Sequence, residues 1–395
     1  MVRSYRYRLK PTRAQAATLV AWLHLTRELY NAALQERRDA WQKQRVRVTA
    51  FEQMRALPEV RAVRSDLSAV PNVVLRGAIR RLDRAFNDFF RRCKSGDTPG
   101  YPRFRGVNRW SSVLIDDLGC KIPICASGTR LNIPLLGKVK FKQHRPIEGV
   151  PKALRIKLDG DGHWYVTLAC VDVPAKPLPS TCQDVGVDLG LSTFAATSAS
   201  EMFENPRALA SARIDVERAQ RRVTRRKRGS RRRRKAVRLL ARKHFHIAQT
   251  RRQHAIDVAK KLVASYDTIY VESLNIKAMA SGVLAKQIRD AGWGGFLYWL
   301  RVKAECAGRE VLEVNPSGTS QVCSECGAEV LKDLRVRVHD CPHCGYVANR
   351  DVNAAQNILR LGRSLRGAAP VVNGRRRSAK SKYRKTEPHS SSDAH

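Results

Sequence analysis

The sequence lacks the features of a membrane or secreted protein. No apolar run approaches the ~20 residues that a membrane-spanning helix requires. Residues 2–9 form a strand-like pattern where a signal peptide would carry its apolar segment. We therefore expect a cytoplasmic protein with no membrane partner. Thiols stay reduced in that compartment, so no function is expected for six scattered cysteines, Cys93, Cys120, Cys125, Cys170, Cys182 and Cys306.

Acidic residues are also scarce. The 395 residues contain 35 Asp and Glu against 75 Lys and Arg, which gives a formal net charge of +40. A chain this basic repels itself on compaction unless an anion neutralises it, and the commonest polyanion is nucleic acid. The composition therefore predicts a nucleic-acid partner, and the length predicts two or three domains.

Four of the cysteines form two pairs near the C-terminus. Cys323 and Cys326 make one Cys-x2-Cys turn, and Cys341 and Cys344 make a second. Each turn presents two sulfurs to one ion, so the two turns together complete the tetrahedral shell of Zn2+; buried thiols or two disulfides are the alternatives. A glycine follows the second cysteine of each pair, where a tight turn needs positive φ, and this favours zinc. Four protein ligands leave no position for a substrate, so the expected zinc is structural.

Three carboxylates stand in predicted strands or at the start of a predicted helix. Asp188 lies in an apolar strand-turn-strand segment, Glu272 ends a later apolar strand, and Asp351 opens the C-terminal helix. Gly186 and Gly190 flank the first acid and permit another backbone or a ligand to approach it. A buried carboxylate is costly unless it is paired or bound to metal, although a single acid at the end of an element is usually a cap or a solvated charge. Together the three acids indicate an RNase H-like mixed sheet flanked by helices, with two Mg2+ ions for phosphodiester hydrolysis.

The remaining sequence indicates two further kinds of structure. An N-terminal strand precedes a helical stretch, and short strands bounded by Gly, Pro or Asp follow it; they predict a small β-barrel that the first strand joins. The predicted fold class is α/β with a β-barrel and a helical lobe. The predicted segments are 1–10 (first barrel strand), 11–93 (helical insertion), 94–180 (barrel), 181–320 (RNase H-like domain), 321–348 (zinc hairpin), 349–362 (C-terminal helix) and 363–395 (disordered basic tail).

Basic side chains recur on two predicted helical segments. The helix that begins after Pro71 carries Asn and Arg at a spacing of four, which suits either a solvated face or a surface that contacts phosphates and base edges. A longer basic run is interrupted at Gly229 and flanked by apolar residues, so a phosphate-binding helical hairpin is favoured over a disordered tail. The candidate nucleic-acid contacts are Asn72, Arg76, Arg80, Arg103, Arg225, Arg226, Arg232 and Arg233.

Several motifs occur in a characteristic order. They are the Pro-Arg-Phe of GYPRFRG, then VGVDLG, IYVESLNIKAM, TSQVCSECG and CPHCGYVANRDVNAAQNIL. From the first strand to about residue 361 the chain resembles the TnpB family, the transposon-encoded RNA-guided DNA endonucleases related to type V CRISPR effectors. In this resemblance VGVDLG corresponds to the first motif of a RuvC-like nuclease domain, IYVESLNIKAM to the second, and the last motif to the third.

The resemblance implies roles for residues and domains. Asp188, Glu272 and Asp351 would be the catalytic acids of a RuvC-like domain with an inserted four-cysteine zinc hairpin. The barrel would be a wedge domain, and the inserted helices would form a recognition lobe. Many relatives have Asp-Arg-Asp where this chain has Asn349-Arg350-Asp351. The outer acid is thus absent, and the three acids needed for cleavage are retained.

The resemblance also implies partners. Family members bind a guide RNA taken from the transposon end and cut both strands of target double-stranded DNA next to a short target-adjacent motif. Asn72 and Arg76 fall on the helix that similar proteins use near that motif. The resemblance further implies a prokaryotic, nucleoid-associated protein, and we expect it to work as a monomer with its RNA.

Three other functions remain open at this stage. A compact type V CRISPR effector would have the same chemistry and differ in its genomic neighbourhood. A non-cleaving RNA-guided or zinc-dependent DNA-binding protein would bind without Mg2+-dependent products. A transposase that joins strands itself is less favoured, because no Tyr or Ser nucleophile motif stands out.

Overall fold

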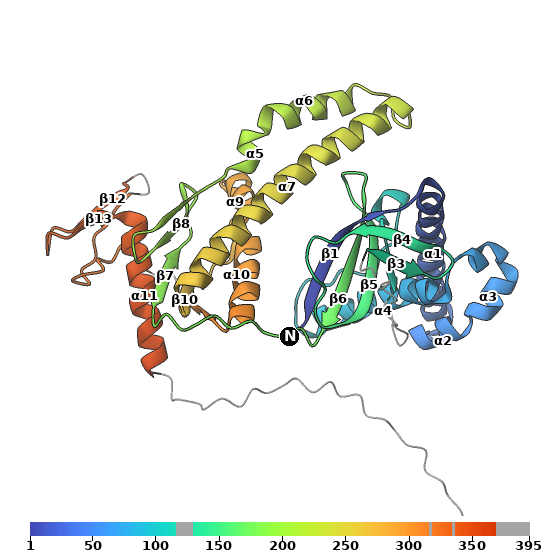
Figure 1. Cartoon of the computed structure of the whole chain (residues 1–395), viewed down its shortest axis with the longest axis horizontal. Helices are drawn as coiled ribbons and strands as arrows, with labels where there is room; N and C mark the ends of the chain where they lie inside the picture. The colour runs from blue at the N-terminus through green and yellow to red at the C-terminus, as the bar shows by residue number, and fades with distance from the viewer. Residues whose placement is uncertain (116–128, 316–317, 334–335, 369–395) are drawn as a thin grey trace, which may run out of the picture. The chain divides into compact units, whose positions relative to one another are not determined.

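The chain is divided into two compact units. The computed structural model describes residues 1–115, 129–315, 318–333 and 336–368. Unit 1 comprises residues 1–182, 205–267 and 276–310, and unit 2 comprises residues 183–204, 268–275 and the residues from 311 onward. Figure 1 labels their helices and strands. Both units therefore combine segments that are far apart in the sequence.

Unit 1 contains a six-stranded antiparallel sheet with the strand order β2-β5-β6-β1-β4-β3. Its strands are β1 (Arg3–Lys10), β2 (Ser112–Ile115), β3 (Arg130–Ile133), β4 (Gly137–Lys142), β5 (Val150–Leu158) and β6 (Trp164–Val171). β1 pairs with β6 and β4, so the structure has the first strand in the sheet formed by the later strands, as predicted. The closed barrel is not found, because β2 and β3 remain unpaired edges within the described residues. Closure requires the edge strands to pair, and the sheet is therefore an open half-barrel.

A set of helices is inserted between β1 and β2. They are α1 (Arg13–Asp39), the π-helical turn η1 (Ala40–Gln44), α2 (Ala50–Arg55), α3 (Leu57–Val63), the 3-10 turn η2 (Ser65–Ala69) and α4 (Asn72–Lys94); the 3-10 turn η3 (Val107–Arg109) follows. Thr12 caps α1 and forms a capping box with Gln15. The apolar stripes of α1 and α4 are buried, with Trp22, Leu75 and Leu82 fully enclosed. They join the inner face of the half-barrel in one hydrophobic core.

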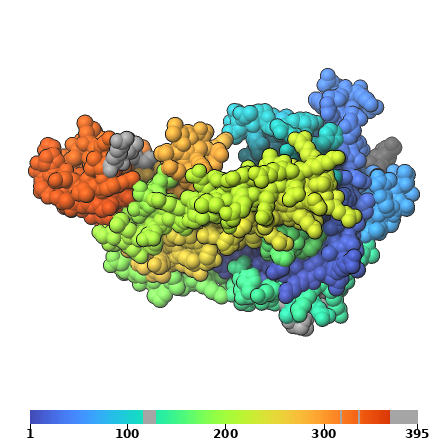
Figure 2. All heavy atoms as spheres, turned by 90° about the horizontal axis from the view of Figure 1, so that it is seen from above, coloured from blue at the N-terminus to red at the C-terminus, as the bar shows by residue number. Residues whose placement is uncertain are grey.

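The remaining helices of unit 1 include a long basic hairpin. They are α5 (Ala208–Ser211), α6 (Arg213–Thr224), α7 (Arg231–Ser265), α8 (Ile276–Met279), α9 (Ala285–Ala291) and α10 (Trp293–Ala307). Ser230 caps the start of α7, so the chain turns at the predicted interruption, and α6 packs against α7. The hairpin is the yellow-green ridge of Figure 2. Gly292 adopts a left-handed conformation (φ 73°) and separates α9 from α10.

Unit 2 is built on a five-stranded mixed sheet with the order β11-β10-β7-β8-β9. Its strands are β7 (Asp184–Asp188), β8 (Thr193–Thr197), β9 (Met202–Glu204), β10 (Thr268–Glu272) and β11 (Glu310–Val314). β10 and β7 are parallel, whereas β7 and β8 are antiparallel, which gives the mixed sheet that the sequence predicts. A two-stranded hairpin of β12 (Val338–Asp340) and β13 (Val347–Asn349) precedes the last helix.

The last helix, α11 (Arg350–Ala368), packs on this sheet against β7, β8 and β10. A Cβ at Gly186 would lie 2.0 Å from the Ala355 carbonyl oxygen and 2.6 Å from the Leu359 nitrogen. Glycine is therefore required where the helix crosses β7. The helix extends beyond the predicted end at residue 362, so the first residues of the predicted tail are helical; residues 369–395 lie outside the described residues. The face of this helix that is buried in the core includes Val352, Asn353, Ala354, Ala355, Asn357 and Ile358.

Two predictions from composition concern cysteines and membranes. Cys93, Cys170, Cys182 and Cys306 are free thiols, while Cys120 and Cys125 lie outside the described residues. No helix in the described part of the chain is both long enough and apolar enough to cross a bilayer.

Candidate metal centres and nucleic-acid surface

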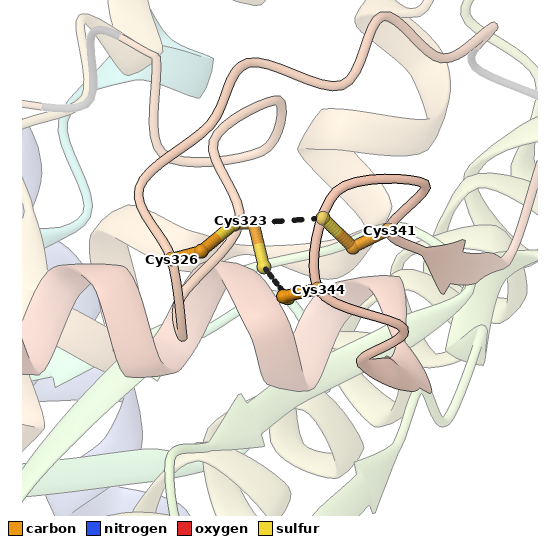
Figure 3. Close-up of side chains that lie close together, drawn as sticks. All are labelled: Cys323, Cys326, Cys341 and Cys344. Carbon is orange, nitrogen blue, oxygen red and sulfur yellow. Dashed lines mark hydrogen bonds between the residues drawn. The ribbon is translucent and has the colours of Figure 1, made fainter.

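The four C-terminal cysteines converge on one point. Their sulfur atoms all lie within 4.8 Å of one another. Cys323 Sγ lies 3.7 Å from Cys344 Sγ, and Cys326 Sγ lies 3.6 Å from Cys341 Sγ, as Figure 3 shows. Sulfurs around a tetrahedral ion with Zn–S bonds of about 2.3 Å are separated by about 3.8 Å. All four are free thiols, so the geometry fits a metal site and does not support the two disulfides.

The backbone holds the two cysteine turns in the same way. The amide of Gly327 donates to the Cys323 carbonyl at 3.0 Å, and the amide of Gly345 donates to the Cys341 carbonyl at 2.9 Å. Both glycines have positive φ, 75° and 72°, as the sequence predicts. Burial raises the pKa of the Cys341 thiol, but backbone N–H groups outweigh this effect and lower that pKa to about 6. The N–H groups of this turn thus favour the thiolate form of Cys341, whereas hydrogen bonds with the neighbouring thiols raise the pKa of Cys344.

Helix α11 fixes the first cysteine turn through polar side chains. The Asn353 amide donates to the Val322 carbonyl at 2.8 Å, and its oxygen accepts from the Ser324 amide at 2.9 Å. One turn further along the helix, Asn357 donates to the carbonyls of Thr319 and Val322 at 2.9 and 2.7 Å. Both asparagines are buried, so these bonds satisfy groups that would otherwise be costly to bury. Residues 319–324 are thereby attached to the helix that carries Asp351.

Two of the three acids are neighbours on parallel strands. Val187 of β7 pairs with Val271 of β10, so the next residues, Asp188 and Glu272, stand side by side at the same end of the sheet. Side chains at i and i+2 share one face of a strand. Gly186 lies against α11, and a Cβ at Gly362 of α11 would meet the Tyr270 ring at 2.1 Å. Asp188 and Glu272 therefore lie on the face of the sheet that α11 covers.

The third acid reaches the same place from α11. Gly186 contacts the helix at Ala355. From Gly186 to Asp188 the strand advances about 6.6 Å, and from Ala355 back to Asp351 the helix advances about 6 Å. Asp188 and Asp351 therefore lie at the same end of the contact between β7 and α11. A Cβ at Gly190 would lie 3.8 Å from the Asp351 carboxylate, so Gly190 leaves room beside it.

The electrostatics of the three acids agree with this arrangement. Burial, followed by the negative charges of Glu272 and Asp351, raises the pKa of Asp188 to about 8. The Leu189 amide and the Arg350 guanidinium oppose this shift only in part. Burial also raises the pKa of Glu272, against a hydrogen bond that its Oε1 accepts from the Thr319 hydroxyl at 3.0 Å. A cation would relieve the repulsion of the Asp188 carboxylate by its two acidic neighbours.

The donor set suits Mg2+, which prefers carboxylate oxygens. Neither Asp188 nor Asp351 forms an ion pair within the described residues, so their oxygens are available as ligands. Among the residues that the structure describes, only the cysteines form a ligand group within 4.8 Å; the three carboxylates are spread more widely.

The candidate nucleic-acid contacts lie on three separate elements of unit 1. Asn72, Arg76 and Arg80 lie on α4, where the asparagine is exposed and the two arginines are half-buried. Arg103 is exposed in the segment between α4 and η3. The other four candidates lie at or near the turn between α6 and α7: Arg225, Arg226, Arg232 and Arg233. Arg233 is half-buried and the other three are exposed. None of the four forms an ion pair with a described residue.

Sequence reasoning missed the residues that position the acids. Thr319 holds Glu272, and Asn353 and Asn357 attach the cysteine turn to α11. The spacing of the two asparagines was a usable signal, because two amides one helical turn apart on the apolar face of a helix must find buried partners. Thr319 carried no such signal, since its partner is remote in the sequence.

Three family descriptions match successive parts of the chain. Residues 1–45 match a family described as "Helix-turn-helix domain", residues 168–282 one described as "Probable transposase", and residues 293–358 one described as "Cas12f1-like, TNB domain". The first description does not fit the geometry, because residues 1–45 contain a strand and one long helix ending in a π-turn. The last match covers α10, the four cysteines and the start of α11.

Whole-chain relatives show the family. A putative RNA-guided DNA endonuclease from Streptomyces pristinaespiralis is 32% identical over 387 residues, covering 96% of this chain and 94% of the relative. The putative RNA-guided DNA endonuclease InsQ from Escherichia coli K12 is 27% identical over 321 residues, covering 76% of this chain and 77% of the relative. The chain therefore belongs to the TnpB family of RNA-guided DNA endonucleases.

A solved structure supports the fold at greater distance. The mini-RNA-guided endonuclease CRISPR-Cas_phi3 aligns with a TM-score of 0.51 at 11% identity, covering 91% of this chain and 92% of the other. At this identity the likeness concerns the fold alone.

Proposed function

We propose that this protein is a transposon-encoded, RNA-guided, Mg2+-dependent DNA endonuclease whose catalytic acids are Asp188, Glu272 and Asp351. The observation that carries the proposal is the meeting of these acids, from three distant segments of the chain, on the α11 face of the unit 2 sheet. The Arg350 charge offsets the raised pKa of Asp188 only in part. A cluster of carboxylates that basic side chains do not neutralise is costly to the fold, which favours a functional role. In this proposal the sheet of unit 2 is the RuvC-like form of the RNase H-like fold.

The chain's own residues would prepare the site in distinct ways. Asp188 and Glu272 are fixed by adjacent parallel strands, and the Thr319 hydroxyl sets the orientation of Glu272. Asp351 is held by the first turn of α11, where its amide donates to the Asn349 side chain at 2.9 Å. Two Mg2+ ions bound by these carboxylates would activate a water for attack on phosphorus and stabilise the leaving 3′ oxygen. Burial of the acids keeps the local dielectric low, which strengthens the interactions that stabilise developing charge.

The cysteine site would hold a structural zinc ion. Its four sulfurs complete the shell, so it offers no position to a substrate. Its position explains its purpose, because the asparagines of α11 connect the first cysteine turn to the helix of Asp351 and to the residue that holds Glu272. Zinc would thus stabilise the frame of the acid site without taking part in the reaction.

The basic surfaces of unit 1 would bind the nucleic acids. The arginines at the turn between α6 and α7 are well placed for backbone phosphates. Asn72 and Arg76 of α4 are candidates for contacts near a target-adjacent motif. A guide RNA and a target duplex are the proposed partners, with one protein copy in each complex.

Cleavage of a guided target tests the proposal. The protein is purified with its co-expressed RNA, and a duplex library matching that RNA is incubated with and without Mg2+. Cleavage of both strands is expected with Mg2+, and Asp188→Asn should abolish it while leaving duplex binding intact. Asp184→Asn is the matched control, because Asp184 lies at the other end of β7 in a partly exposed ion pair with Arg363 and should retain cleavage.

The same experiment separates the rival functions. Guided binding without Mg2+-dependent products from the unmutated protein would refute the endonuclease and identify a non-cleaving binding protein. Sequencing the copurified RNA distinguishes a transposon-end guide from the repeat-derived guide of a CRISPR effector. Light scattering of the loaded complex measures its stoichiometry, and a dimer would contradict the single-copy expectation.

A further inference from the structure

A pocket in unit 1 combines exposed aromatic rings with arginines. It has a volume of about 480 Å3 and is lined by the end of α1, by η1 and by the segment between α4 and η3. Its walls are Leu34, Arg38, Trp41, Gln42 and residues 101–104. The volume lies within the range of about 300–1,000 Å3 that is usual for small-molecule sites. A mononucleotide is of a size to occupy it.

Three large aromatic side chains at this pocket remain exposed. Trp41 is 53% exposed, Tyr101 is 46% exposed and Phe104 is 46% exposed. Leu34 and Pro102 are buried and form its floor. Removing these rings from water would stabilise the protein, so a cluster of exposed aromatics requires an explanation.

The charge of the pocket selects among occupants. Arg38 and Arg103 line it, and within the described residues neither forms an ion pair with an acid. Arg45 adds a third cation, with its guanidinium carbon 5.8 Å from the centre of the Trp41 ring. No acidic side chain lines the pocket. Flat aromatic faces beside guanidinium groups match an unpaired nucleobase with its adjoining phosphates, because bases stack on rings and phosphates pair with arginine.

The walls are held in place before any ligand arrives. Asn31 of α1 makes two reciprocal hydrogen bonds with the Arg105 backbone, at 3.1 and 2.8 Å, and so fixes the segment at 101–104 beside α1. Tyr101 meets Phe86 and Phe89 of α4 edge to face, with ring centres 5.6 and 5.4 Å apart. The π-helical turn η1 continues directly from α1 and carries Trp41, which lines the pocket. A preformed site loses little entropy when it binds.

We infer that this pocket, the Trp41 pocket, captures one unpaired nucleotide by stacking its base on Trp41, Tyr101 or Phe104 and pairing its phosphates with Arg38 and Arg103. The inference rests on the proposed function, and it adds a subsite for single-stranded nucleic acid on unit 1, whereas the three acids belong to unit 2. The guide RNA and an unwound strand of the target DNA are the two sources of such a nucleotide.

An abasic scan tests the Trp41 pocket. The complex is assembled without Mg2+, and single nucleotides of either the RNA or one DNA strand are replaced in turn by abasic sites. At one position or a short run of positions, the abasic site should weaken binding to the wild-type protein roughly tenfold or more, as loss of one base–aromatic stack does. Trp41→Ala should bind the unmodified nucleic acid more weakly by the same factor. Placing the abasic site at that position should then cause no further loss of affinity in this variant. The arm in which this non-additivity appears identifies the ligand as RNA or DNA.

Matched variants keep the test independent of folding. Trp41→Phe retains a ring and should restore most of the affinity, and Phe104→Ala should repeat the Trp41→Ala result. Phe51→Ala removes an aromatic ring that is 71% exposed elsewhere on unit 1 and should bind as the wild type does. Arg103→Ala should lower the slope of log affinity against log salt by about one.

The outcomes separate this inference from the proposed function. If Trp41→Ala and Phe104→Ala bind both nucleic acids as tightly as wild type, the Trp41 pocket is not a nucleotide site, even though guided cleavage persists. Equal losses of affinity at every abasic position, in the wild type and in Trp41→Ala alike, would also overturn the inference. A peptide that binds in the Trp41 pocket without competing with nucleic acid would overturn it too. If the wild-type protein binds no RNA at all, both proposals fail.

Discussion

Replacing Thr319 by valine isolates the hydrogen bond that orients Glu272. The Thr319 hydroxyl donates to Glu272 Oε1 at 3.0 Å, and the two residues are 2% and 7% exposed. This bond lowers the pKa of Glu272 against the raising effect of burial. Valine has nearly the same shape and no donor, so the substitution removes the bond and leaves the packing in place.

The magnitude follows from the chemistry of the bond. A hydrogen bond to a charged group contributes about 1.5–3 kcal/mol, which corresponds to about one to two pKa units. The pKa of Glu272 should therefore rise by that amount in Thr319→Val. If cleavage requires the ionised Glu272, the acidic limb of the pH–rate profile should move to higher pH by one to two units. On that limb the rate should fall by about 10- to 100-fold and recover as the pH is raised.

Single-turnover cleavage across a pH series measures this shift. Thr319→Ser keeps the donor and should stay close to the wild-type profile. Thr268→Val is the matched control, because Thr268 is equally buried on β10 but its hydroxyl accepts from Arg366 at 2.8 Å instead of contacting an acid. A Thr319→Val profile that coincides with the wild type would refute the assignment of Glu272 to the reaction or of Thr319 to Glu272.

Three further predictions concern the frame of the two metal sites. In metal-free protein the pKa of Asp188 lies near 8, against 3.8 in the unfolded chain. The free energy of unfolding should therefore fall as the pH rises from about 4 to 8, by several kcal/mol at most. Urea unfolding in EDTA measures this fall, and Asp188→Asn should remove most of the pH dependence. Cys326→Ser should lower the bound zinc measured by mass spectrometry and destabilise unit 2, whereas Cys93→Ser, at an exposed free thiol, should do neither; full zinc content in Cys326→Ser would contradict the site. Gly186→Ala forces a Cβ against the backbone of α11, so it should destabilise by about 1–3 kcal/mol and reduce cleavage, while Gly295→Ala, with open space around it, should leave the rate unchanged.

The sequence predicted those features that depend on local patterns. The cysteine spacing and the two following glycines predicted a metal hairpin, and the four sulfurs do cluster. The strand-like pattern of residues 2–9 predicted a first strand, and β1 pairs with β6 and β4. Asp188 and Glu272 were selected because burying a carboxylate in an apolar strand is costly unless it is paired or bound to metal. In the structure the two residues lie next to each other at the ends of paired strands.

What the sequence did not predict depends on contacts between distant segments. Whether the sheet closes is decided by pairing between edge strands, which the pattern inside each strand does not specify. The helix α11 extends past residue 362 although its last turns are polar, because its buried face and the Gly362 contact with Tyr270 hold it on the sheet. The Trp41 pocket appeared in the sequence only as separate aromatics, since a π-turn brings them together.

The order of the acids along the chain has a consequence for synthesis in the cell. Asp351 and the helix that carries it are made after nearly everything else, and both the cysteine turns and Thr319 also come late. A ribosome that stalls between α10 and α11 would release a polypeptide that retains the basic surfaces of unit 1 but lacks Asp351. Under the roles proposed for these residues, such a product would bind nucleic acid without cutting the host chromosome.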